Sequence, residues 1–255
     1  MNRRACATLK YPFMLPNFLI IGATKAGTTS VHHYLDQHPE IFMCKRKETN
    51  FFSQDSATCF LGDAIRSRED YEREFDAVKN EKAIGETSPA YLAVPMAPKN
   101  IHDDIPNAKL IAILRDPAER AYSHYLMRRR QKKEFRSSFE ECIDEPDIDP
   151  QRSYKSRGFY GEQMERYRKY FPEDEMKIFL YEDFVKDPKT ILRDIFSFLG
   201  VDPSFTPDMS ERYNANPETA PLDPKLRSKL IEIYRSDIKK LRALIGRDLS
   251  AWLKV

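Results

Sequence analysis

The sequence has few cysteines, no marked excess of either charge and no long apolar run. Its 255 residues include four cysteines without a Cys-x-x-Cys pair or a zinc-finger spacing, so we expect free thiols rather than a disulfide framework. Forty-two basic and forty acidic side chains give a net charge of +2, which argues against binding to nucleic acid or an anionic membrane. Apolar runs such as residues 18–21 are far shorter than the ~20 residues of a membrane span.

The amino-terminal residues also lack the apolar core of a secretory signal. Residues 1–16 contain no run of about seven apolar side chains. A hydrophobic share of 41%, with 12% aromatic residues, is enough for a sizeable core. We therefore expect a cytoplasmic globular protein.

Short apolar runs and amphipathic segments alternate along the chain. Strands are expected at residues 17–21, 41–43, 83–85, 110–114 and 178–181. Helices are expected to begin near residues 28, 117, 160, 188 and 224. This order predicts a single α/β domain over residues 17–255, with a mainly parallel sheet and helices on both faces, after an extension at residues 1–16.

The clearest helix start follows the strand at residues 110–114. Asp116 can cap this helix, Pro117 fits its first position, and Glu119 can close a capping box. The basic run at residues 128–133 is expected on a solvated helix face. The acidic stretch 140–151 contains prolines and is expected to form a surface loop.

A loop bounded by Gly22 and Gly27 joins the first strand to a helix that opens with Thr-Thr-Ser. Backbone N–H groups and the positive end of a helix bind phosphate in this geometry, and Lys25 adds a further donor. An ATP-binding P-loop has its lysine directly before the hydroxyl residue, whereas Lys25 precedes Gly27 by two positions. The segment predicts a P-loop-like phosphate site, and a turn without a ligand is the alternative.

Two segments resemble motifs of the sulfotransferases that use 3′-phosphoadenosine-5′-phosphosulfate (PAPS), in particular the heparan sulfate sulfotransferases and their bacterial relatives. Residues 22–30, GATKAGTTS, are similar to the 5′-phosphosulfate loop of that family, and residues 114–123, LRDPAERAYS, to its 3′-phosphate motif. The resemblance extends from about Pro16 to Trp252. It implies that the 5′-phosphosulfate is bound by Lys25, Ala26, Gly27, Thr28, Thr29 and Ser30.

The resemblance assigns Arg115 and Ser123 to the 3′-phosphate. Arg115 ends a strand and Ser123 lies about two turns into the next helix, so both can face one edge of the sheet. The planar fork of arginine donates two parallel hydrogen bonds to a phosphate. The alternatives are an ion pair of Arg115 with Asp116 or Glu119, and a packing or back-bonding role for Ser123.

A glutamate in a basic segment matches the catalytic base of the family. Residues 45–52, KRKETNFF, resemble the segment that carries the base, and Glu48 is the matching position. A surface salt bridge is the alternative for Glu48. Heparan enzymes often have a histidine where this chain has Asn50, and the resemblance assigns Asn50 and Phe51 to acceptor binding.

Three further segments match the family. Residues 85–91, GETSPAY, resemble the lining of the acceptor cleft, which implies that Thr87 and Tyr91 bind the acceptor, although heparan enzymes commonly have a lysine in place of Thr87. Arg157 and Arg212 match a helix start and a late loop that contact PAPS. The alternatives for these arginines are a helix-start ion pair and a solvated loop side chain.

The predicted reaction moves a sulfuryl group in line from PAPS to a hydroxyl or amine. Lys25 would neutralise the leaving oxygen and Glu48 would deprotonate the acceptor, without a metal or a covalent intermediate. The residues at positions 50 and 87, the small net charge and the expected absence of an amino-terminal anchor favour a small metabolite or natural product as acceptor.

Two other functions stay open from the residues alone. One is a P-loop nucleotide kinase or NTPase, for which Asp116 is the only obvious Mg²⁺ partner. The other is a non-catalytic nucleotide-binding protein. His32, His33 and His38 lie near Asp36, but no second cluster completes a metal site, so we expect no bound metal.

Overall fold

Five apolar segments form a parallel sheet with the strand order β2-β3-β1-β4-β5. The computed structural model describes residues 14–54, 64–145, 154–211 and 220–255. All neighbouring strands pair in parallel, and Leu19 of the central strand β1 lies between Glu86 and Leu110. All residues of β1 are buried, which explains its unbroken apolar character. The strands are β1 (Phe18–Gly22), β2 (Ile41–Met43), β3 (Ala83–Thr87), β4 (Lys109–Leu114) and β5 (Met176–Leu180).

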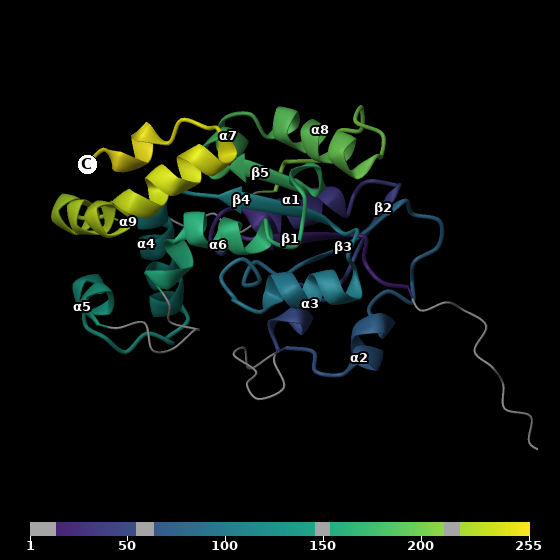
Figure 1. The fold of residues 1–255 in the computed structure, drawn as a ribbon, viewed down its shortest axis with the longest axis horizontal. Coiled ribbons are helices and arrows are strands. Elements are labelled where there is room, and N and C mark those ends of the chain that lie inside the picture. Colours follow the sequence, from purple (N-terminus) through teal and green to yellow (C-terminus); the bar gives the residue numbers. More distant parts are fainter. Residues whose placement is uncertain (1–13, 55–63, 146–153, 212–219) are drawn as a thin grey trace, which may run out of the picture.

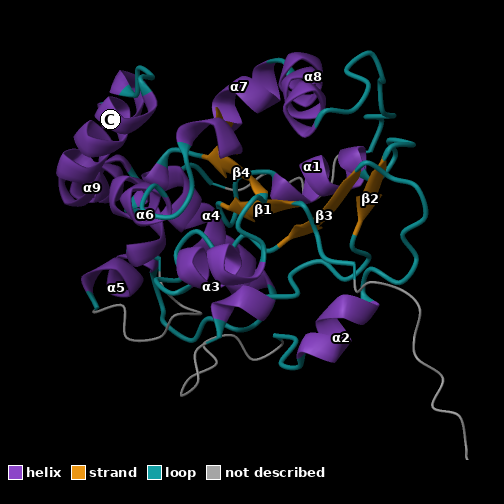
Figure 2. Ribbon diagram, turned by 45° about the vertical axis from the view of Figure 1, so that its right-hand side comes forward, coloured by secondary structure: helices purple, strands orange, loops and turns teal. Residues whose placement is uncertain are grey.

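Helices cover both faces of this sheet. They and the 3₁₀ turns (η) are α1 (Thr28–Leu35), η1 (Phe51–Ser53), α2 (Arg68–Arg73), α3 (Ala97–Asp104), α4 (Pro117–Arg130), α5 (Phe139–Asp144), η3 (Ser156–Gly158), α6 (Tyr160–Tyr167), η4 (Glu173–Glu175), α7 (Tyr181–Lys186), α8 (Pro188–Leu199), α9 (Pro224–Ile245) and η5 (Ser250–Leu253). Helices α1, α7 and α8 lie on one side of the sheet, and α3 and α6 on the other (Figure 1). Figure 2 shows the same arrangement from a second direction. The predicted single-domain α/β fold is confirmed.

Three helices begin where Asp-Pro pairs predict a start. The carboxylates of Asp116, Asp187 and Asp223 accept hydrogen bonds from first-turn N–H groups of α4, α8 and α9. Only half of the predicted capping box of α4 forms. Oδ1 of Asp116 accepts the N–H of Glu119 (3.3 Å), but the N–H of Asp116 donates to Oε1 of Glu182 (3.0 Å), and the Glu119 carboxylate pairs with arginines instead. The start of α4 is thereby tied to α7.

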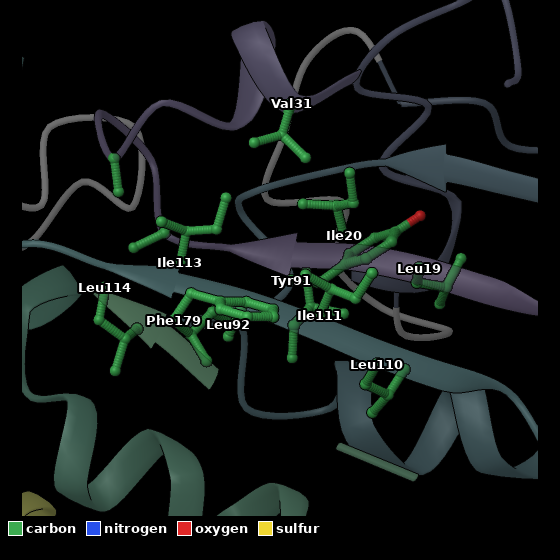
Figure 3. Close-up of a cluster of buried hydrophobic side chains, with 14 of the residues drawn as sticks. Leu19, Ile20, Val31, Tyr91, Leu92, Leu110, Ile111, Ile113, Leu114 and Phe179 are labelled. Carbon is green, nitrogen blue, oxygen red and sulfur yellow. The ribbon is translucent and has the colours of Figure 1, made fainter. Parts of the chain in front are cut away.

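The core surrounds β1 and β4. Figure 3 shows Val31 of α1 close to Ile20 of β1, with further buried side chains of β4 beside them. Gly85 of β3 leaves room for the ring of Phe18 on β1, because a Cβ there would lie 2.1 Å from Cζ of Phe18. The end of β3 lies beside the end of β1, where the N–H of Ser88 donates to the carbonyl of Ile20 (3.1 Å).

Two local predictions, one at the end of α4 and one after it, are corrected. Arg128, expected on a solvated face, is buried and donates to the carbonyl of Lys133 (2.8 Å). Helix α5 occupies the start of the stretch expected to be a loop, because Ser138 caps it and Phe139 is buried in the core.

The expectations on cysteines and on membrane spans can be compared with the described residues. Cys44 and Cys142 are buried free thiols, whereas Cys6 and Cys59 lie outside the described residues. Within the described ranges, no helix combines the length and the apolar character needed to cross a membrane.

Candidate functional site

The carboxyl ends of four strands bring the predicted site residues to one edge of the sheet. Lys25 follows β1, Glu48 follows β2, Thr87 ends β3 and Arg115 follows β4. Because the strands are parallel, their ends meet at this edge, on both sides of the central strand. Open α/β sheets bind ligands at such a place.

The segment at residues 22–30, here called the phosphate loop, presents the start of α1 to this edge. Gly27, at φ 83°, precedes α1 in the left-handed conformation that glycine adopts readily. The ring of Tyr181 packs close to Gly27, because a Cβ added at Gly27 would lie only 3.2 Å from this ring. No side-chain cap bond forms at Gly27 and no acidic residue lies in the first turn of α1. The first N–H groups of α1 are therefore suited to an anion.

Lys25 lies in this loop among other cations. Burial, followed by the nearby charges of Arg130, Arg115 and Lys47, lowers the pKa of Lys25 to about 8, and the Glu48 carboxylate partly opposes this shift. Like charges that are partly removed from water repel each other strongly unless an anion lies among them. The loop thus has an excess of positive charge that a phosphosulfate group would neutralise.

Arg115 is held beside this loop by three contacts. Its Nη1 donates to the carbonyl of Lys25 (3.3 Å), and its guanidinium lies over the ring of Tyr181, 4.9 Å from the centroid. Nη2 is 3.9 Å from Glu119, so the ion pair given above as an alternative for Arg115 is present but long. The side chain is 21% exposed, so a phosphate can still reach it.

Glu119 also pairs with an arginine of α9. Nη1 of Arg227 lies 3.1 Å from Glu119, and Nη2 lies 2.6 Å from Asp116. Arg227 thus bridges the two acidic residues at the start of α4. Two further residues that were predicted to bind the donor lie within the described residues. Ser123 is buried on α4, and Arg157 lies in η3.

Arg157 of η3 reaches the phosphate loop, since its Nη1 lies 3.0 Å from Oγ1 of Thr24. Thr24 is one residue before Lys25, so Arg157 lies at the loop, and its contact with PAPS stays a prediction. Arg212, the other predicted arginine, lies outside the described residues.

Glu48 lies at the exposed rim of the site. Its side chain is 53% exposed, and Oε1 accepts a hydrogen bond from Nζ of Lys47 (2.9 Å), which is the salt bridge given above as the alternative. The carboxylate is also close enough to Lys25 to raise the pKa of that lysine. An exposed carboxylate beside the phosphate loop can meet an acceptor that approaches from solvent.

The predicted acceptor-binding residues lie next to Glu48, and most are buried. Thr87, Asn50 and Tyr91 are almost fully buried, and the Tyr91 hydroxyl accepts the backbone N–H of Phe52 (3.3 Å). Phe51 is half-buried and stacks on Tyr71, with ring centroids 4.2 Å apart. Of these four side chains, Phe51 is therefore the most accessible to an acceptor.

Two buried polar residues of this region had no predicted role in it: His32, considered above only for a metal site, and Glu86. Nδ1 of His32 on α1 lies 3.0 Å from the hydroxyl of Thr87, and burial lowers the pKa of His32 to about 4, so the ring is neutral at pH 7. Glu86 is fully buried in β3 and accepts a hydrogen bond from Thr49. Two sequence features could have indicated them. His32 lies one turn into the helix that follows the phosphate loop, and Glu86 is a carboxylate in an otherwise apolar strand.

No group of three His, Cys, Asp or Glu side chains within the described ranges is arranged to hold a metal ion.

Comparisons with known proteins agree with the geometry. Residues 15–223 match the sulfotransferase domain family. A sulfotransferase crystal structure from Alicyclobacillus acidocaldarius is similar, with 36% identity, a TM-score of 0.85, and coverage of 94% of this chain and 100% of the other.

Two curated relatives are more distant. The membrane-associated sulfotransferase kil1 of Dictyostelium discoideum is 23% identical over 92% of this chain and 66% of its own length. The bifunctional heparan sulfate N-deacetylase/N-sulfotransferase 4 of Mus musculus is 27% identical over 94% of this chain. The chain spans 31% of that mouse protein, so it corresponds to one part of the longer relative.

Proposed function

Since this chain belongs to the sulfotransferase family, we propose that it transfers the sulfuryl group of PAPS to a hydroxyl or amine of an acceptor. The observation that carries the proposal is the cationic phosphate loop. A largely buried Lys25 lies beside Arg115, Arg130 and Lys47 at the start of a helix without a side-chain cap. This arrangement suits a ligand with several negative charges, such as the two phosphorylated ends of PAPS.

The residues divide the reaction between donor and acceptor. The loop from Lys25 to Ser30 holds the 5′-phosphosulfate, and Arg115 with Ser123 binds the 3′-phosphate. Glu48 takes the proton of the acceptor as its oxygen or nitrogen attacks sulfur, and the bond from sulfur to the 5′-phosphate oxygen breaks. Lys25 stabilises the negative charge that develops on this leaving oxygen. The products are the sulfated acceptor and adenosine 3′,5′-bisphosphate (PAP).

We expect PAP to bind without a metal and to raise the melting temperature, because a ligand that binds only the folded state stabilises it. Calorimetry and thermal unfolding with PAP and with ATP, each with and without Mg²⁺, measure this. Protection by ATP with Mg²⁺ but not by PAP would contradict the proposal and favour a nucleotide kinase.

PAP binding near pH 8 should also take up protons. The pKa of Lys25 is about 8 in the free protein, so this lysine is partly neutral there, and a bound phosphate raises its pKa again. At pH 6 Lys25 is already charged, and its contribution to proton uptake should vanish. Titration calorimetry in two buffers of different ionisation enthalpy measures the number of protons. The Lys25→Met variant should lose the uptake at pH 8, and unchanged uptake in that variant would assign the proton to another group.

We further propose that the acceptor is a small hydroxylated or amino metabolite. Thr87 occupies the position at which heparan enzymes commonly have a lysine, and its hydroxyl contacts the neutral ring of His32. Asn50 occupies the position at which those enzymes often have a histidine. These are neutral hydrogen-bonding groups, which suit an acceptor without the many negative charges of heparan sulfate. Exposed cations such as Arg130 lie near Lys25, where they can pair with the negative charges of the donor rather than with a polyanionic acceptor.

Labelled PAPS offered to heparan sulfate and to a panel of small alcohols, phenols and amines tests the acceptor class. We expect label in one or more small acceptors. Efficient labelling of heparan sulfate, with none in the small panel, would exclude the small-acceptor proposal and leave the sulfotransferase activity established.

A further inference from the structure

The backbone around the proposed base has an uncommon conformation. Glu48, at φ 64°, and Asn50, at φ 51°, both lie in the left-handed region, on either side of Thr49. Residues other than glycine adopt this conformation at a cost in free energy, and it persists only where surrounding groups hold it. Residues 48–50, here called the base segment, must therefore be fixed by contacts with the rest of the fold.

The end of β3 supplies two of these contacts through the backbone of the base segment. The N–H of Glu48 donates to the carbonyl of Thr87 (2.8 Å), and the N–H of Asn50 donates to Oγ of Ser88 (3.1 Å). The residue between them, Thr49, is bonded through its side chain. Its hydroxyl donates to Oε2 of Glu86.

Glu86 is an unusual residue for the centre of a sheet. Its carboxyl group is fully buried, and Oε1 has no hydrogen-bond partner within the part of the chain that the structure describes. Burial raises the pKa of Glu86 to about 7. The groups that face it are hydroxyls, a thiol and a second carboxylate, from Thr49, Ser88, Tyr91, Tyr71, Cys44 and Glu74.

Burying a carboxyl group without partners for both of its oxygens lowers the stability of the folded state, and an apolar side chain at this position of the strand would avoid that loss. The contact that Glu86 makes with the base segment gives a reason for its presence. Thr49 is itself fully buried, so without Glu86 its hydroxyl would have only the more distant oxygens of Tyr91 (3.2 Å) and Ser88 (3.5 Å).

We propose that Glu86 is a positioning residue for Glu48. By accepting the hydrogen bond of Thr49, it keeps the base segment in the left-handed conformation that places Glu48 beside Lys25. Glu86 itself contacts neither donor nor acceptor. The inference rests on the proposed function, because it takes Glu48 as the base.

The proposal predicts a loss of turnover without a loss of donor binding. A displacement of about 1 Å in a catalytic group can cost up to about a hundredfold in rate. We expect kcat to fall by at least about tenfold when either partner of the Thr49–Glu86 bond is removed. The Kd for PAP should stay unchanged, because the phosphate motifs follow β1 and β4.

Four variants and a control test this. Thr49→Val removes the donor with little change of shape, Glu86→Leu removes the acceptor, and the double variant should lose no more activity than the more impaired single variant. Glu86→Gln keeps an oxygen that can accept the bond and should recover most of kcat. The control is Tyr71→Phe, which removes a buried hydroxyl that faces Glu86 and has no hydrogen-bond partner among the described residues.

Amide hydrogen exchange adds a readout that needs no turnover. In Thr49→Val the N–H groups of Glu48 and Asn50 should exchange at least about tenfold faster, while those of β1 stay protected. If Glu86→Leu does not fold, Thr49→Val and Glu86→Gln decide the question.

Each outcome separates the two proposals. Unchanged kcat and unchanged exchange in Thr49→Val, in a protein that binds PAP and transfers sulfate, would overturn the positioning role and leave the proposed function intact. A wild-type protein that binds PAP but transfers nothing would refute the proposed function. The exchange rates would then still test whether Glu86 holds the base segment.

Discussion

Replacing Lys25 with methionine should lower the rate of sulfuryl transfer by about a hundredfold or more. This is the loss seen when one preorganised group that stabilises developing charge is removed. The ammonium group of Lys25 is largely buried near the charges of Arg115 and Arg130, so it is already partly desolvated before the bond to sulfur breaks. Single-turnover measurement with saturating PAPS reports this step without the contribution of product release.

The same substitution should make the free protein more stable at pH 7. A lysine whose pKa is lowered from 10.5 to about 8 by folding is disfavoured as a cation in the folded state. The penalty is fully present below pH 8, decreases as the pH rises from 8 to 10.5, and is absent above that range. Thermal unfolding of both proteins across this range measures it.

A matched control is Lys99→Met, which removes an exposed lysine that pairs with Asp103 on α3. It should change neither turnover nor the pH dependence of stability. A Lys25→Met protein with normal turnover would remove this lysine from the mechanism, whatever its effect on stability.

Replacing Glu48 with glutamine should lower kcat by about a hundredfold or more, the low end of the usual contribution of a general base. Glutamine has nearly the same shape but accepts no proton at neutral pH. The Kd for PAP should stay nearly unchanged, since Glu48 acts on the acceptor. Steady-state rates with a competent small acceptor, together with calorimetry of PAP, measure both quantities.

Glu69→Gln is the matched control, because Glu69 is exposed on α2 and pairs with Arg73 in the same way as Glu48 pairs with Lys47. It should leave kcat and PAP binding unaltered. Full turnover by the Glu48→Gln protein would leave Glu48 with the salt bridge to Lys47 as its only described role.

The fold was predictable because it follows from local features. The apolar runs at β1 and β4 read as buried strands, and the Asp-Pro pairs at Asp116, Asp187 and Asp223 mark helix starts that depend on a few neighbouring residues. The phosphate loop was visible for the same reason, since a strand, a glycine turn and a helix start lie together in the sequence.

The contacts within the site depend on residues far apart in the chain. The capping box at Glu119 was a sound local expectation, but Glu182 and Arg227 compete for the same groups from 66 and 111 residues away from Asp116. The pairing of Thr49 with Glu86 and of His32 with Thr87 likewise depends on how β2, β3 and α1 come together. The partners are 37 and 55 residues apart, which is beyond the reach of a local sequence pattern.

The salt bridges of Arg227 also bear on where the functional unit ends. Similarity to the family covers residues 15–223, and α9, which carries Arg227, begins just beyond it at Pro224. In a protein cut at residue 223, Glu119 would lose its cation from α9 and would be left facing Arg115. We expect Glu119 then to compete for Arg115, the arginine proposed to bind the 3′-phosphate, so the unit needed for the proposed binding of PAPS should extend through α9.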